Sequence, residues 1–190
     1  MWKELYQTIE ADFAADAAHW YFTATVAGKK YSDCATVWLL AGFNILGTSS
    51  ASQYGHFIQR TYTGLPAHTM IRFQINMWAI DSWDTGANDG IYFNFDGRTV
   101  DGWHLSHTNF PANICGATWT ELRDILITGN VAHTGSTLTF RMYAHFDETS
   151  ATETFGIRDV TMMFSDDISI PETLCAYATA APGAITTKRC

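Results

Sequence analysis

The sequence predicts an all-β protein: an antiparallel, jelly-roll-like β-sandwich preceded by a short N-terminal amphipathic helix and followed by an irregular C-terminal tail. Two observations favour the sandwich. Apolar and polar residues alternate with a period of two in eight or nine segments, and clusters of Gly, Asn, Asp and Ser separate these segments. No helical pattern is interspersed among them, which favours an antiparallel sandwich over an α/β fold.

The first residues carry the one helical pattern in the chain. Apolar side chains recur at helical offsets with acidic residues between them, which is the stripe of an amphipathic helix. We therefore expect a helical extension over residues 1–19. If its own sandwich does not cover the stripe, a neighbouring subunit would. The stripe consists of Trp2, Leu5, Tyr6, Ile9 and Phe13.

The sandwich itself is expected over residues 20–170. The segments WYFTATV, ATVWLLAGF and GHFIQRTY predict three strands before residue 65, and Trp38 is assigned to the core because its strand is apolar. Later strands alternate strictly, so one set of side chains should face inward. The inward set is Ile71, Phe73, Ile75, Met77, Ala79, Ile91, Phe93, Phe95, Leu138, Phe140, Met142 and Ala144.

The last twenty residues change in composition. PETLCAYATAAPGAITTKRC is small, Thr- and Ala-rich and contains two prolines. This composition is typical of a tail or linker, so residues 171–190 are expected to lie outside the core.

The four cysteines contain no CxxC pair, which argues against a zinc cluster and favours two disulfides. We expect Cys34 to pair with Cys115 and Cys175 with Cys190. The alternatives are the other two connectivities, four free thiols, and a bond from Cys190 to a neighbouring subunit. Paired cysteines would imply an oxidising compartment.

Composition excludes several partners. The net charge is −8 with only 11 Lys and Arg residues, whereas nucleic-acid binding needs clustered positive charge. We expect no transmembrane segment, because no apolar run approaches 18 residues, and no signal peptide is visible in the charged first residues. A divalent cation or a neutral glycan suits this surface better.

Four spaced motifs cover about residues 55–165: GLPAHTMIRFQINMWAIDSWD, YFNFDG, NICG and ETFGIRDVTMMF. Together they resemble the β-sandwich domains of ciliate and related protist cell-surface proteins, whose pattern runs Leu-Pro-x-His, Ile-Asp-Ser-Trp-Asp, Cys-Gly and Phe-Gly-Ile-x-Asp. The resemblance implies a secreted or surface-displayed, non-enzymatic domain. The last strand also looks like that of extracellular adhesion modules that hold a structural calcium. His68, in the Leu-Pro-x-His turn, is expected to bond a neighbouring strand or loop.

Acidic residues gather after the long strand that ends near Asp81. Calcium takes six to eight oxygen ligands, and we interpret one set of residues as a calcium site. The alternative is a polar turn, since Asp, Asn and Gly are common turn residues. The expected calcium set is Asp81, Asp84, Asn88 and Asp89, with Glu153 and Asp159 from the last strand.

An enzyme is not expected. A glycosidase would need two carboxylates about 5 to 10 Å apart, and Asp81, Asp84, Glu153 or Asp147 could supply such a pair only by accident. The chain lacks GxSxG, HExxH and a phosphate-binding glycine loop.

Two functions follow from these patterns. The main hypothesis is an extracellular structural or adhesive domain, supported by the expected calcium site, that self-assembles into a surface filament through head-to-tail contacts. The alternative is a calcium-dependent carbohydrate-binding module, in which Trp83, Trp103 and Trp119 from loops stack on sugar rings. Those tryptophans could equally pack over the ends of the sandwich.

Overall fold

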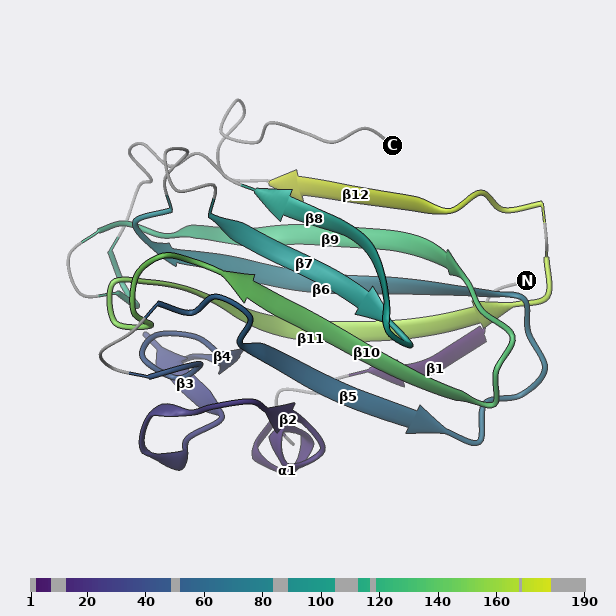
Figure 1. The fold of residues 1–190 in the computed structure, drawn as a ribbon, viewed down its shortest axis with the longest axis horizontal. Coiled ribbons are helices and arrows are strands. Elements are labelled where there is room, and N and C mark those ends of the chain that lie inside the picture. Colours follow the sequence, from purple (N-terminus) through teal and green to yellow (C-terminus); the bar gives the residue numbers. More distant parts are fainter. Residues whose placement is uncertain are drawn as a thin grey trace.

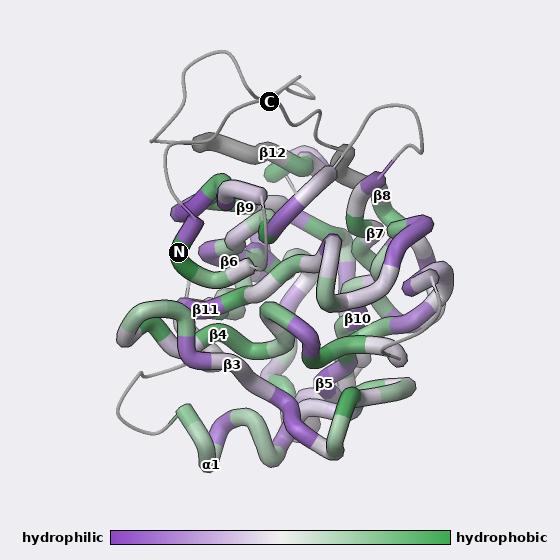
Figure 2. Tube along the Cα trace, turned by 90° about the vertical axis from the view of Figure 1, so that its left-hand side faces the viewer, coloured by the Kyte–Doolittle hydropathy of each residue, from purple (hydrophilic) through white to green (hydrophobic). Residues whose placement is uncertain are grey.

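The computed structural model describes residues 3–7, 13–48, 52–83, 89–104, 113–116, 119–167 and 169–178. They form two packed antiparallel sheets, which confirms the predicted β-sandwich (Figure 1). Figure 2 shows the two layers side by side, with α1 beyond the end where β3 and β5 lie. Among the described residues, no helix has the length and apolar character needed to cross a bilayer.

The larger sheet has seven strands in the order β12-β9-β6-β11-β4-β3, and β1 also pairs with β11. β11 is the long central strand: β6 runs along one of its edges, while β4 and β1 share the other. The strands are β1 (Lys3–Gln7), β3 (Tyr31–Cys34), β4 (Val37–Ala41), β6 (Met70–Asp81), β9 (Leu122–Ala132), β11 (Glu153–Ser165) and β12 (Thr173–Ala178).

The smaller sheet has five strands in the order β2-β5-β10-β7-β8, and it lies in front of the larger sheet in Figure 1. A short α-helix precedes β2, the first strand of this sheet in the sequence, and a 3-10 turn follows β2. The elements are α1 (Phe13–Ala18), β2 (Tyr21–Phe22), the 3-10 turn Val26–Gly28, β5 (Phe57–Thr63), β7 (Gly90–Phe95), β8 (Arg98–His104) and β10 (Thr137–His145).

The core lies between the two sheets, where the alternation predicted it. All twelve side chains assigned to the inward set are buried. Phe73 of β6 meets Phe93, Phe95 and Phe140 of the smaller sheet at centroid distances of 5.5, 5.1 and 6.0 Å. Burial of this apolar surface is the main force that holds the sheets together.

The helix expected over residues 1–19 is wrong for most of its length. Leu5 and Tyr6 lie in β1, which pairs with β11, so residues 3–7 belong to the sandwich. Only Phe13–Ala18 is helical, and Phe13 is buried in this chain's own core. Strand pairing satisfies the backbone groups of residues 3–7, and this tertiary contact overrides the helical pattern. Trp2 and Ile9 lie outside the described residues.

The predicted tail is also partly wrong. Thr173–Ala178 forms β12, which pairs with β9 along six positions. The Thr-rich sequence has the composition of a strand as well as of a linker, and the open edge of β9 supplies the partner. Residues 179–190, including Cys190, lie outside the described part of the chain.

The disulfide between Cys34 and Cys115 is confirmed, with a Cα–Cα distance of 4.6 Å. It ties the end of β3 to the 113–116 loop, over a small apolar cluster that includes Leu39 and Trp78. The buried Glu121 carboxylate also holds this loop, because it accepts hydrogen bonds from the Ile114, Cys115 and Gly116 N–H groups. The Cys175–Cys190 pairing stays a prediction.

Candidate functional site

Three acidic residues come together at the end of the sandwich where β6 ends and β11 begins. Asp89 lies just before β7, Asp147 just after β10, and Glu153 is the first residue of β11. One oxygen from each lies within 4.8 Å of the others. Asp89 and Glu153 belong to the expected calcium set. Asp147 does not; the sequence suggested it only as one of four carboxylates that could form an accidental glycosidase pair.

The carboxylates of two other members of the expected set make different contacts. Asp81 is buried with a positive φ of 63°, and its Oδ1 accepts the Trp119 N–H at 2.9 Å, so it supports a loop. Asp159 is exposed and pairs with Arg158 at 2.9 Å. Asp84 and Asn88 fall in residues 84–88, which are not described. We keep the name acidic cluster for Asp89, Asp147 and Glu153.

Glu153 has unusual electrostatics because its side chain is buried. Burial raises its pKa to about 10, helped by a hydrogen bond to Asp89 and by the charges of Asp89 and Asp147. Without a cation, Glu153 therefore keeps its proton at neutral pH. A divalent cation would replace that proton, and carboxylate oxygens are the ligands calcium prefers. The acidic cluster could hold such an ion.

The raised pKa of Glu153 makes stability depend on pH. The unfolded carboxyl ionises near 4.5 and the folded one near 10, so the free energy of unfolding should fall as pH rises between these values. Glu153→Gln mimics the protonated side chain. We expect this variant to match the wild type at pH 4 and to be more stable at pH 8, as measured by urea unfolding in chelator.

Calcium should narrow this difference in stability at pH 8. At a hundredfold excess over its dissociation constant it would add about 2.7 kcal/mol to the stability of the wild type, and nothing to Glu153→Gln. Asp159→Asn is the matched control, because Asp159 lies away from the acidic cluster. Equal calcium effects on the wild type and Glu153→Gln would exclude the cluster as the ion site.

A row of aromatic side chains crosses the outer face of the smaller sheet. Tyr143 of β10 stands directly opposite Phe57 of β5 and Tyr92 of β7. The Phe57 and Tyr143 rings have centroids 5.0 Å apart, and Tyr21 of β2 lies 6.0 Å from Phe57. Four adjacent strands span about 14 Å across the sheet. The row is therefore long enough to contact an extended ligand.

Polar side chains form a second row next to the aromatic one. Arg141 stands opposite Gln59 and Asn94 on the neighbouring strands. Its Nε donates to Gln59 Oε1 at 2.5 Å and its Nη1 to the Tyr143 hydroxyl at 3.1 Å, while its guanidinium lies 5.0 Å from the Phe57 ring centroid. These contacts hold Arg141 against the face. We call Tyr21, Phe57, Gln59, Tyr92, Arg141 and Tyr143 the platform.

The platform continues towards the acidic cluster. His145 follows Tyr143 on the outer face of β10, and its ring lies 5.5 Å from Tyr92 and 4.6 Å from Tyr54. Tyr54 is about half exposed. Desolvation raises its pKa, and the negative charges of the acidic cluster raise it further. The acidic cluster therefore lies close to this end of the platform.

The tryptophans expected to stack on sugars have different positions. Trp83 is fully buried, its ring 4.7 Å from Phe146 and its Nε1 donating to the Thr154 carbonyl at 2.8 Å. Its predicted sugar-binding role is therefore wrong, because no ligand can reach the ring. Trp119 is 55% exposed in a loop. The side chain of Trp103 lies outside the described part.

A groove of about 850 Å³ lies beside α1, away from the platform. Trp38 and Tyr31 line it, with ring centroids 5.3 Å apart. Trp38 is 38% exposed, so its assignment to the core is wrong. Leu39 and Leu40 fill the buried positions of β4 instead. This groove is the second exposed aromatic site in the described chain.

Sequence reasoning missed the platform, although a signal for it was present. Tyr143 and Arg141 occupy the polar phase of an alternating strand, and Tyr92 lies between the inward Ile91 and Phe93. Aromatic residues at outward positions have no core to fill. Such residues on neighbouring strands indicate a binding face.

No family model and no curated protein matches the chain. Solved structures with a similar arrangement include a sugar-binding protein, the EclA C-terminal domain (17% identity, 64% of this chain and 72% of that chain, TM-score 0.38).

Two others are carbohydrate-binding modules. One is the CBM2 module of the evolved Dit protein of Lactobacillus casei BL23 phage J-1 (10% identity, 87% and 97% coverage, TM-score 0.44). The other is the mannan-recognising module TmCBM27 (10% identity, 86% of this chain and 98% of that chain, TM-score 0.38). The chain is a β-sandwich that resembles these modules at low identity.

Proposed function

We propose that this chain is a non-catalytic glycan-binding module and that its ligand, a neutral glycan, binds across the platform. The observation that carries the proposal is the pairing of an aromatic row with a polar row on one sheet face. The hydrophobic faces of sugar rings pack on aromatic side chains. Sugar hydroxyls need directional donors and acceptors, which Gln59 and Arg141 supply.

The geometry of the platform suits a preorganised site. Gln59, the Tyr143 hydroxyl and the Phe57 ring all contact the Arg141 side chain, so little side-chain entropy is lost on binding. Two of its five N–H donors serve these contacts within the described residues. The remaining donors are available for ligand oxygens. In Figure 1 no described helix or strand passes in front of this sheet.

The filament hypothesis loses its premise. It required one exposed apolar helical stripe, but Leu5 and Tyr6 lie in β1 and Phe13 is buried in the same chain. We therefore do not propose self-assembly. The disulfide between Cys34 and Cys115 is consistent with an extracellular domain.

Tyr143→Ala tests the platform. Removing the central ring of the row is expected to cost about 2 kcal/mol of binding free energy, which is about a thirtyfold rise in Kd. A glycan array run with and without chelator identifies the ligand, and isothermal titration calorimetry measures the affinity. Thermal unfolding of each variant shows that the fold is intact.

Trp38→Ala is the matched control, because it removes an exposed aromatic side chain from the other sheet. It should leave Kd unchanged. Loss of binding in Trp38→Ala with full binding in Tyr143→Ala would move the site to the groove beside α1. The absence of binding to every neutral glycan on the array would overturn the proposed function.

A further inference from the structure

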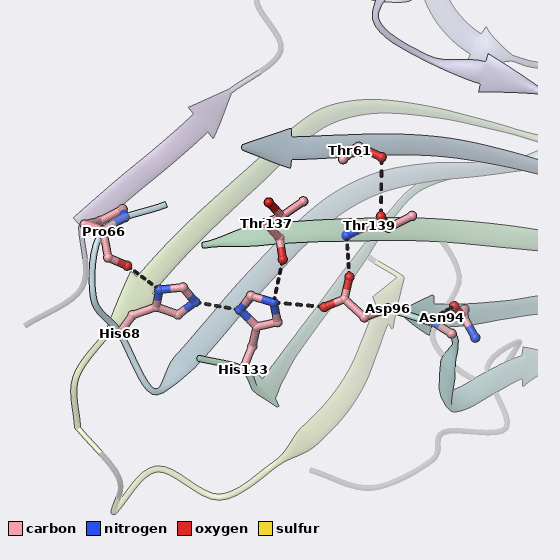
Figure 3. Close-up of polar contacts among 9 residues, drawn as sticks. Thr61, Pro66, His68, Asn94, Asp96, His133, Thr137 and Thr139 are labelled. Carbon is pink, nitrogen blue, oxygen red and sulfur yellow. Dashed lines mark hydrogen bonds and ion pairs between the residues drawn. The ribbon is translucent and has the colours of Figure 1, made fainter. Parts of the chain in front are cut away.

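Two histidines form a hydrogen-bonded chain at the end of the sandwich opposite the acidic cluster (Figure 3). His68, in the loop before β6, places its Nδ1 2.6 Å from the Pro66 carbonyl oxygen and its Nε2 2.7 Å from Nδ1 of His133. His133, in the loop after β9, places its Nε2 2.9 Å from an Asp96 oxygen and 3.1 Å from the Thr137 carbonyl. His68 is 4% exposed.

The acceptors around the two rings determine how many protons the pair holds. Among the described residues, His68 Nδ1 faces only a carbonyl, and His133 Nε2 faces only a carbonyl and a carboxylate. Both of these nitrogens must therefore carry hydrogen. The two inner nitrogens face each other at 2.7 Å, and one more proton must lie between them. Two neutral imidazoles carry two N–H groups, so three protons give the pair one positive charge.

The neighbouring charges fit this count. Asp96, in the turn between β7 and β8, lies against His133, and its other oxygen accepts the Thr139 N–H at 2.7 Å. The Phe164 ring of β11 packs near His68, 5.9 Å away. Glu172 accepts the Ala132 N–H at 2.7 Å and pairs with Arg98. The charge of Glu172 is thus balanced, which leaves Asp96 as the described counter-charge of the histidine pair.

We propose that His68, His133 and Asp96 form a proton-dependent clasp, in which one shared proton between the two histidines ties the loops of the larger sheet to the β7–β8 turn of the smaller sheet. When the proton leaves, two lone pairs face each other at hydrogen-bond distance and the link breaks. The clasp thus makes this end of the sandwich sensitive to pH. It is independent of the glycan platform.

The direction of the pH effect follows from proton counting. Histidines in an unfolded chain titrate near pH 6.5. Above that pH the folded pair holds more protons than the unfolded chain, so stability falls as pH rises. Below it both histidines of the unfolded chain become charged, whereas the clasp carries one positive charge. The unfolded chain then binds more protons, so stability falls as pH drops. The clasp therefore stabilises most near pH 6.5, with up to a tenfold change in the unfolding constant per pH unit on each side.

Histidine-ring ¹⁵N–¹H spectra of the wild type count these protons directly. At pH 7.5 we expect three ring N–H groups on His68 and His133 together. Asp96→Asn removes the counter-charge, so the third proton should leave at a lower pH. Two neutral rings with one N–H each at pH 7.5 would overturn the proposal without any need for a variant that folds.

Urea unfolding between pH 5 and 8.5 gives the energetic readout. His68→Gln can donate an amide N–H to His133 Nδ1 and so needs no extra proton, which should flatten the pH profile. His19→Gln is the matched control, because His19 is exposed and lies in the turn after α1. It should keep the wild-type pH profile. Parallel profiles for the wild type and His68→Gln would contradict the clasp.

Discussion

Trp83→Ala is expected to destabilise the protein by about 3–5 kcal/mol from lost packing. The ring is fully buried against Phe146, and truncation leaves a cavity that the rigid sandwich can fill only in part. A further 1–3 kcal/mol, roughly, comes from the buried Thr154 carbonyl, which loses the indole N–H that it accepts. Urea unfolding measures the sum.

Trp83→Phe separates the two contributions. It keeps most of the ring volume and loses the hydrogen bond to Thr154, so its loss should be about 1–3 kcal/mol. Both variants should bind glycan with wild-type affinity at temperatures where they remain folded, because Trp83 lies beneath the surface. A Trp83→Ala protein with unchanged stability and weaker glycan binding would show that Trp83 contacts the ligand.

The double variant Cys34→Ala/Cys115→Ala is expected to lose about 4 kcal/mol. The two cysteines are 81 residues apart, and closing a loop of this length removes about 4.5 kcal/mol of unfolded-chain entropy. Part of the loop attachment survives, because Glu121 still holds the Ile114, Cys115 and Gly116 N–H groups. The measurement is the urea midpoint with and without reductant.

Reductant provides the internal check on this result. It should lower the midpoint of the wild type to that of the double variant, and it should not shift the double variant further unless a second disulfide exists. Cys175→Ala/Cys190→Ala therefore tests the pairing that stays a prediction. Equal midpoints for the oxidised wild type and the Cys34→Ala/Cys115→Ala protein would show that the bond adds no net stability.

Local patterning was sufficient for the core of the sandwich. Successive side chains of a strand point to opposite faces whichever strand lies beside it. Phe73, Phe93 and Phe140 could therefore be assigned inward from their own segments alone, and all three are buried. The same argument failed for Trp38. Its segment is apolar at nearly every position, so no alternation shows which side chains face inward.

The two ends of the chain depended on partners far away in sequence. Residues 3–7 suit a helix or a strand, and the free part of the β11 edge decides for a strand. Residues 173–178 suit a linker or a strand, and β9 decides in the same way. In each case the backbone hydrogen bonds of a sheet outweigh a weak local preference.

The sequence by itself determined the β-sandwich class and the inward set of side chains, since period-two alternation is a local property. Tertiary structure alone decided which outward residues meet. Strand pairing places Tyr143 beside Phe57 and Tyr92, joins Asp147 to Asp89 and Glu153, and sets His68 against His133. Such groupings depend on strand order and register, and these are set by long-range packing of the whole chain.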